Sequence, residues 1–240
     1  MKKMKAGILT LCVCAVPHLA HAQSMQFSDK GWVSFTAGGQ FGSHDITTSS
    51  TFDLYGEQAT TGSSQTITGG AMVDFGGAYR VWRNNLLAGV SFSHESSQSN
   101  VDITASIPDP VVFGKMRNVT SQVTGADHDE NALHFSAIWM FPIANKLDVG
   151  VFGGPTIFFV KQDIVETLTV TEPVPTVTGP LVKISKTTGG INLGVDAQYL
   201  IWDKIALGGM MRYTWGSATI SGSKLTVGGF ELGGGARYRF

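Results

Sequence analysis

The sequence has little cysteine. Its two cysteines, Cys12 and Cys14, stand in an N-terminal segment with three parts: a lysine-rich start, an apolar run and the small-residue site Ala20-His21-Ala22. These parts together predict a cleaved secretory signal peptide over 1–22. The mature chain, 23–240, then has no cysteine, which excludes disulfides and thiol chemistry from an exported protein.

The N-terminal segment also lacks a hydrophobic run long enough to anchor the chain. Its apolar run at 6–16 is shorter than the roughly 20 residues that a transmembrane helix needs. Lipid attachment to a cysteine is a second alternative, but Leu11 and Val13 precede the two cysteines, where lipoprotein signals resemble one another in having a small residue. Cleavage of the segment remains the prediction.

An excess of basic residues is missing as well. The chain has 17 Lys and Arg against 18 Asp and Glu, and loss of the three signal-peptide lysines leaves the mature chain with a charge near −4. This balance argues against a nucleic-acid partner. His44, His94 and His128 are scattered without the spacing of metal ligands, so they are interpreted as loop or rim residues, and no metal or cofactor is predicted. No linker divides the chain, which predicts one domain.

A sustained apolar period of 3.6 residues is absent, whereas glycine reaches 30 of 240 residues. Apolar and polar residues instead alternate with a period of two, which predicts strands with one apolar and one polar face. Each predicted strand is long for a soluble domain. The eight strands span approximately 31–42, 68–82, 86–97, 131–141, 147–160, 187–202, 205–216 and 225–240.

The connections between these strands alternate in length. Short turns are expected at 83–85, 143–146 and 203–204, and long polar connections at 43–67, 98–130 and 161–186. This alternation puts the long connections at one end of an up-and-down barrel. Aromatic residues gather near both ends, as in the interfacial girdles of membrane proteins. The prediction is an all-β, eight-stranded antiparallel up-and-down transmembrane β-barrel with long external loops and short periplasmic turns. A periplasmic lipocalin-like barrel, with the apolar face inward, is the alternative.

The last strand, 230–240, ends on Arg237-Tyr238-Arg239-Phe240. With this ending and the strand pattern, the mature chain resembles the small eight-stranded outer-membrane barrels of the OmpA and OmpX kind. The resemblance implies a monomer in the outer membrane of a Gram-negative bacterium, among outer-membrane lipids and lipopolysaccharide. It also implies that Tyr238 and Phe240 belong to a signal read by the outer-membrane assembly machinery.

The polar faces of the strands predict a charged cluster in the lumen. Antiparallel pairing about the last link brings Arg212 close to Glu231, and pairing about the preceding turn brings Asp196 within a diagonal of Arg212. Asp74 and Glu95 face the same lumen. Buried charges must pair, so the favoured interpretation is a structural plug. A gate is the second interpretation, and it needs an alternative pairing of comparable energy.

The sequence predicts no catalytic residue. His134 and Ser136 share a strand face and could act as base and nucleophile of a lipid A-modifying enzyme, but that face is lumenal and a lipid's acyl chains lie outside. The long connections at 43–67, 98–130 and 161–186 are rich in acidic, Thr and Ser residues. They are interpreted either as contacts for a host surface, phage or lipopolysaccharide, or as solvated polypeptide. The predicted function is structural or surface-interacting, with adhesion as its type; a narrow, low-conductance, porin-like channel is the alternative and an enzyme a remote one.

Overall fold

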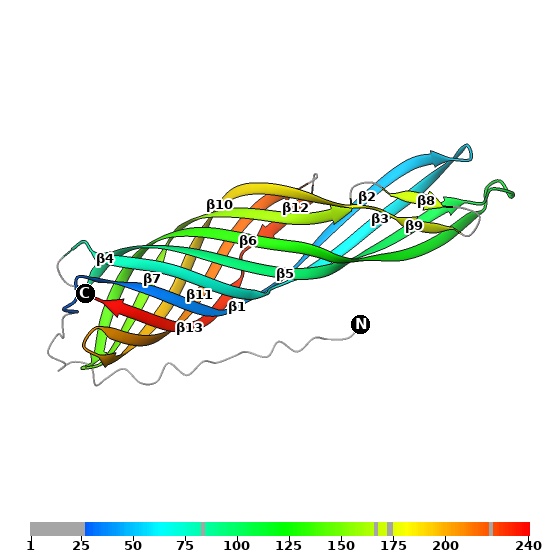
Figure 1. The fold of residues 1–240 in the computed structure, drawn as a ribbon. Helices are drawn as coiled ribbons and strands as arrows, with labels where there is room; N and C mark the ends of the chain where they lie inside the picture. The colour runs from blue at the N-terminus through cyan, green and yellow to red at the C-terminus, as the bar shows by residue number, and fades with distance from the viewer. Residues whose placement is uncertain (1–26, 83–84, 166–167, 172–174, 221–222) are drawn as a thin grey trace, which may run out of the picture.

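The computed structural model describes residues 27–82, 85–165, 168–171, 175–220 and 223–240 (Figure 1). The predicted signal peptide lies outside the described residues. Among the described residues, no helix is long and apolar enough to cross a membrane. The strands, in chain order, are β1 (Gly31–Phe41), β2 (Ser43–Leu54), β3 (Glu57–Thr68), β4 (Ala71–Arg80), β5 (Leu86–Pro108), β6 (Met116–Ala144), β7 (Leu147–Val165), β8 (Thr169–Thr171), β9 (Thr176–Thr178), β10 (Leu181–Trp202), β11 (Ile205–Ile220), β12 (Ser223–Val227) and β13 (Phe230–Arg239).

Eight of these strands form a closed ring. In ring order they are β1, β4, β5, β6, β7, β10, β11 and β13, and every neighbouring pair is antiparallel. The first and last strands pair along their whole length, from Trp32 opposite Arg239 to Phe41 opposite Phe230, and this seam closes the sheet. A closed sheet leaves no edge in the ring. The predicted eight-stranded barrel is confirmed.

The barrel carries its apolar residues on the outside. Phe75 is 64 % exposed and Leu193 62 %, and both belong to the apolar faces predicted from the alternation. The aromatic residues expected to form girdles are exposed too. They are Trp82, Phe141, Trp202, Tyr238 and Phe240 at the short-turn end, and Phe41, Phe92, Phe159 and Trp215 at the other end. The band between these two sets is the membrane-facing surface, and the lipocalin-like alternative, with its apolar face inward, is wrong.

The long connections differ from the prediction because most of their residues are in strands. β2 and β3 pair with each other as a hairpin, and β5 and β6 continue as a ribbon to a turn at 109–115. β8 pairs with β9, and β12 with β11. An extension projects beyond the barrel at the end opposite the C-terminus (Figure 1). It is formed by β2, β3, β8, β9 and β12 together with residues 98–127 of the β5–β6 hairpin, 162–165 and 181–186. We call this part of the molecule the extension.

The extension has a hydrophobic core of its own. Ile103, Ile107 and Val177 are fully buried there, with Phe52 and Val119 packed against them. On β6 the inward face changes at Gly125, which has a positive φ of 77° beside a register shift, so that Val123 and Val119 turn toward this core. One extra residue in a strand reverses which face the following residues occupy.

Candidate functional site: the lumen and its rim

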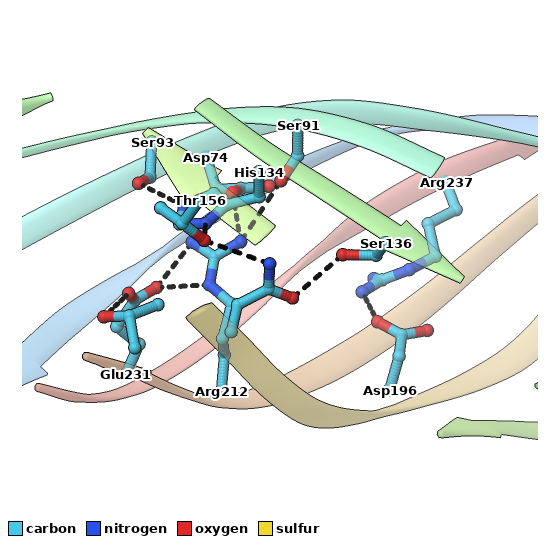
Figure 2. A network of polar contacts seen from close by, with 12 residues as sticks. Asp74, Ser91, Ser93, His134, Ser136, Thr156, Asp196, Arg212, Glu231 and Arg237 are labelled. Atoms are coloured by element: carbon cyan, nitrogen blue, oxygen red, sulfur yellow. Dashed lines mark hydrogen bonds and ion pairs between the residues drawn. The ribbon is translucent and has the colours of Figure 1, made fainter. Parts of the chain in front are cut away.

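Arg212 is the centre of the lumen. It lies on β11, where it pairs directly with Glu231 of β13, and its side chain is 2 % exposed. Its Nε donates to Glu231 Oε2 at 2.8 Å, and its Nη1 donates to Asp74 Oδ2 at 2.9 Å and to Ser91 Oγ at 3.1 Å (Figure 2). The guanidinium therefore joins two carboxylates from different sides of the barrel.

The two carboxylates of this cluster are buried almost completely. Glu231 also accepts a hydrogen bond from Thr214 Oγ1 at 3.0 Å. Charges removed from water are costly unless they are paired and hydrogen-bonded, and the planar guanidinium supplies several donors in a fixed geometry. Asp74, Arg212 and Glu231 thus form an acid–base–acid cluster whose members depend on one another.

Asp196 does not join this cluster through an ion pair. The predicted register is confirmed, since Asp196 lies opposite Met210 and diagonal to Arg212. Its carboxylate is instead bonded to Arg237 of β13, nearer the short-turn end (Figure 2). Of the predicted members, Asp74 therefore joins Arg212 and Glu231, whereas the placement of Asp196 in this cluster is corrected. Arg237 passes over Gly208 of β11, where a Cβ would collide with Arg237 Nη1, so the missing side chain at Gly208 leaves room for the guanidinium.

The lumen between the two ion-pair clusters is narrow. A cavity of about 60 Å³ is lined by Asp74, Arg212, Asp196 and Arg237, and it has room for only a few waters. Towards the short-turn end, apolar side chains share the lumen with charged ones, whereas the predicted interior was polar. Buried Trp32, Leu87, Ile138, Met140, Phe152 and Met210 pack there.

The short-turn end is closed by Phe27 and Arg239. The Phe27 ring meets Trp32 edge to face at 5.9 Å, and the Arg239 guanidinium lies over that ring at 4.7 Å. Arg239 also forms ion pairs with Asp29 at 2.6 Å and with Asp148 at 2.7 Å. An aromatic ring and a paired cation thus cover the end of the barrel interior.

Glu95 lies apart from the Arg212 cluster, at the upper rim. It follows Phe92 of the girdle and meets His128 and Glu130 of β6, with its carboxylate 3.9 Å from His128 Nε2. Within the part of the chain that the structure describes, neither oxygen of Glu95 has a hydrogen-bond partner, although the side chain is buried. The predicted placement of Glu95 with Asp74 is corrected: it belongs to a rim cluster of Glu95, His128 and Glu130. His128 lies at the rim, which agrees with one of its two interpretations, but it belongs to strand β6 and is buried rather than in a loop.

The rim cluster has shifted proton affinities. Burial raises the pKa of Glu95 to about 7, assisted by the negative charge of Glu130 and opposed by His128. Burial alone would lower the pKa of His128, but Glu130, Gln162 and Glu95 together raise it. Glu130 accepts the Gly228 N–H at 3.0 Å, while His44 Nε2 is bonded to Gly228 O at 3.0 Å. The cluster therefore connects β6 to β2 and to the β12–β13 turn. No group of three His, Cys, Asp or Glu in the described residues is arranged to hold a metal ion.

His134 and Ser136 face the lumen, as the alternation predicts. His134 is hydrogen-bonded to Ser93 Oγ and to Thr156 Oγ1, both at 2.9 Å (Figure 2). Ser136 donates instead to Asn192 Oδ1 at 2.9 Å. Both nitrogens of the histidine are thus bonded to hydroxyl groups, and the two residues belong to a polar network that crosses the barrel.

Sequence reasoning found Arg212 and Glu231 but missed three partners. Thr214 lies two residues beyond Arg212 on the same strand face, so the alternation itself carried a signal for it. Arg237 and His128 carry no comparable signal, because only the three-dimensional closure of the barrel brings them to Asp196 and Glu95.

Comparison with known families decides the class of this barrel. Residues 6–240 match the model described as outer membrane protein beta-barrel domain. The chain belongs to this family. Its location is the bacterial outer membrane, with the short turns in the periplasm and the extension outside the cell. No curated protein sequence matches the chain.

Solved structures of outer-membrane proteins resemble this fold. The Neisserial surface protein A has 16 % identity and a TM-score of 0.47, covering 88 % of this chain and 97 % of that chain. The attachment invasion locus protein Ail of Yersinia pestis has 11 % identity and a TM-score of 0.37, covering 87 % and 99 %. The outer membrane protease OmpT of Escherichia coli has 9 % identity and a TM-score of 0.50, covering 90 % and 98 %. At such identity the likeness concerns the fold alone.

Proposed function

We propose that this protein is a closed membrane anchor that presents a rigid extracellular structure for contact with other surfaces, a role of the adhesion type. The observation that carries the proposal is the difference between its two halves. The lumen is filled by buried side chains and crossed by the Arg212 ion pairs, whereas the extension has its own buried core. Binding residues are often carried on loops or hairpins that a rigid scaffold positions.

The filled lumen supports a plug more than a pore. Opening a path would separate Arg212 from Glu231 and Asp74, and breaking a buried pair commonly costs about 3–5 kcal/mol. The apolar packing around Trp32 and Phe152 would have to move as well. A closed barrel leaves the extracellular side as the place where this protein meets other molecules.

A narrow pore is the second candidate, and the small cavity favours it. The cavity lies between Arg212–Asp74 and Arg237–Asp196, so a change of partners among these four charges is the rearrangement a gate would use. In planar bilayers we expect no single-channel current from the wild type. If the wild type does carry current and the Glu231→Gln variant changes it, the lumen cluster is a gate and the interpretation as a plug is wrong.

Catalysis is not part of the proposed function. His134 is buried in the lumen between Ser93 and Thr156, away from the membrane-facing surface. Incubation of the purified protein with lipid A should leave every acyl chain in place. Loss or transfer of an acyl chain would make the protein an enzyme.

The surface role is tested on whole cells. Bacteria without other adhesins would display either the wild type or a variant in which a two-residue turn replaces residues 44–67, the β2–β3 hairpin. We expect attachment to epithelial cells to fall in the variant, while heat-modifiable migration in gels shows that its barrel is intact. Equal attachment by the variant, the wild type and cells without the protein would contradict the proposal.

Export and assembly complete the proposed function. We infer that residues 1–22 are removed during export and that residues 23–240 form the mature barrel. Tyr238 and Phe240 lie exposed at the periplasmic end of β13, where the assembly machinery would read them. Phe240→Ala should lower the amount of folded barrel in the outer membrane, whereas Phe41→Ala at the opposite girdle should not.

A further inference from the structure

The turn between β5 and β6 exposes large apolar side chains to water. Val111 is 87 % exposed, Phe113 85 % and Val112 49 %. The turn lies at the end of the molecule opposite to the chain's C-terminus, next to the tip of the β2–β3 hairpin (Figure 1). These three residues, 111–113, are called the apolar tip. It lies well beyond the membrane-facing band, so the protein's own membrane does not cover it.

The apolar tip is held in one shape by hydrogen bonds. Asp109 Oδ1 accepts the N–H of Val111 at 2.9 Å and that of Val112 at 3.2 Å, and the Asp109 N–H donates to Lys115 O at 2.7 Å. Gly114 has a positive φ of 78°, and its N–H donates to Glu57 Oε1 at 2.8 Å. Glu57 begins β3, so this bond ties the two neighbouring hairpins together.

A firmly supported ribbon presents this tip. Ile107, close before the turn, is fully buried in the core of the extension, whereas Val111 and Phe113 point away from it. An ordered turn that keeps several large apolar side chains in water is a feature of surfaces that bind a partner or a membrane. The apolar tip is therefore expected to bind an apolar partner.

The size and charge of the tip select that occupant. A stable protein interface buries about 800 Å² on each partner, which three side chains on a convex turn do not provide. The boundary of a lipid bilayer, by contrast, accepts apolar side chains from a narrow protrusion. The charges around the tip have no positive excess, with Asp53, Asp109 and Glu57 against Lys115 and Arg117. Recognition must then depend on apolar insertion rather than on attraction between charges.

We propose that the apolar tip inserts into the surface of a lipid bilayer that faces the cell. The inference rests on the proposed surface role and names its partner: the phospholipid of an opposing membrane. The extension sets the distance from the bacterial membrane, and Val111 and Phe113 enter the opposing one. Each inserted side chain adds to the affinity because its apolar surface leaves water.

The test uses the full barrel in nanodiscs and empty phospholipid vesicles. Co-flotation would be measured with phosphatidylcholine alone and with an equal part of phosphatidylserine added, at low and high salt. We expect the wild type to float with both kinds of vesicle at both salt concentrations. The double variant Val111→Ser/Phe113→Ser should bind at least about tenfold more weakly, a change of about 1.4 kcal/mol. Phe113→Trp should bind as well as the wild type or better.

The matched control is Val90→Ser, which makes the same change on the membrane-facing band. It should not alter flotation. Wild-type protein that does not float, or a double variant that floats equally well, would overturn the inference. Binding that requires phosphatidylserine and disappears at high salt would overturn it too, since attraction between charges would then be the cause. If the double variant loses attachment to cells although the wild type never binds vesicles, the partner is a protein and the proposed surface role stands without this inference.

Discussion

The barrel and the extension use the same strands with opposite chemistry. On β5, Ser93 and Glu95 face inward in the barrel, and farther along the strand Ile103 and Ile107 face inward in the extension. The outward face changes in the opposite sense, from Phe92 to Thr104. Lipid surrounds one part and water the other, so the apolar residues turn toward whichever side is free of water. A single strand can therefore carry its apolar residues on the outer face within the membrane and on the inner face in water.

Removal of the central cation should have the largest effect. Arg212→Ala leaves Asp74 and Glu231 buried without their partner, and we expect a loss of about 3–5 kcal/mol from the free energy of unfolding. Urea titration in detergent, followed by heat-modifiable migration, measures this. Lys115→Ala removes an exposed cation of the extension and should change stability by no more than about 1 kcal/mol. If both variants lost the same free energy of unfolding, the buried ion pairs of the barrel would contribute no more to stability than an exposed pair does.

A charged residue on the outer face should destabilise the barrel, which lipid surrounds, much more than the extension, which water surrounds. Phe75→Arg puts a charge on the membrane-facing band, and we expect it to cost about 2–4 kcal/mol near the middle of the bilayer. Thr104→Arg makes a charge on the outer face of the extension and should change stability by about 0.5 kcal/mol or less. Refolding yield into lipid vesicles and urea titration measure both. A tolerated arginine at position 75 would contradict the assignment of this face to lipid.

Truncation within the core of the extension should act locally. Ile103→Ala removes a fully buried side chain from a small cluster, and we expect a loss of about 2 kcal/mol in the stability of the extension. Hydrogen exchange of residues 98–127 should speed up, while exchange in the barrel strands stays unchanged. Thr104→Ala, on the opposite face of the same strand, is the control. Faster exchange throughout the barrel would mean that the two halves unfold as one unit.

Acidification should stabilise the rim cluster, which lies where the barrel meets the extension. We expect this effect on stability to be the smallest of those predicted. Because the pKa of Glu95 is raised from 4.5 to about 7, the folded rim holds a proton that the unfolded chain releases as pH rises across this window. The raised pKa of His128 acts in the same direction: its contribution is complete below 6.5 and is lost as pH rises through the folded value. Stability of the rim therefore decreases between about pH 4.5 and 7 and above.

Hydrogen exchange of the Gly228 amide at pH 5 and pH 8, corrected for the intrinsic rate, measures this effect. We expect greater protection at pH 5 in the wild type. Glu95→Gln, which cannot titrate, should reduce the difference between the two pH values. An unchanged difference in that variant would assign the pH effect to other groups.

The sequence predicted the contacts that form between strands adjacent in the chain. Arg212 and Glu231 belong to consecutive barrel strands joined by a short link, so counting residues about that link placed them side by side. Asp74 is 138 residues away from Arg212 and reaches it across the lumen, and alternation alone does not set distances across a barrel. The strands of the extension were missed because their outward residues are Thr, Ser and Asn, which also suit a solvated loop. The buried Trp32 and Phe152 were missed because a lumen was expected to be polar throughout.

The pairing of β1 with β13 determines when the barrel can close during assembly. Its middle is lined on both sides by small residues, with Ala37 opposite Gly234 and Gly38 opposite Gly233. Since β1 is the first and β13 the last of the barrel strands in chain order, the join forms only after β13 has been delivered. Until then the first strand keeps an open row of amides and carbonyls that any other strand can use. The cell must therefore shield that row throughout translocation, and the final strand ends the need for shielding.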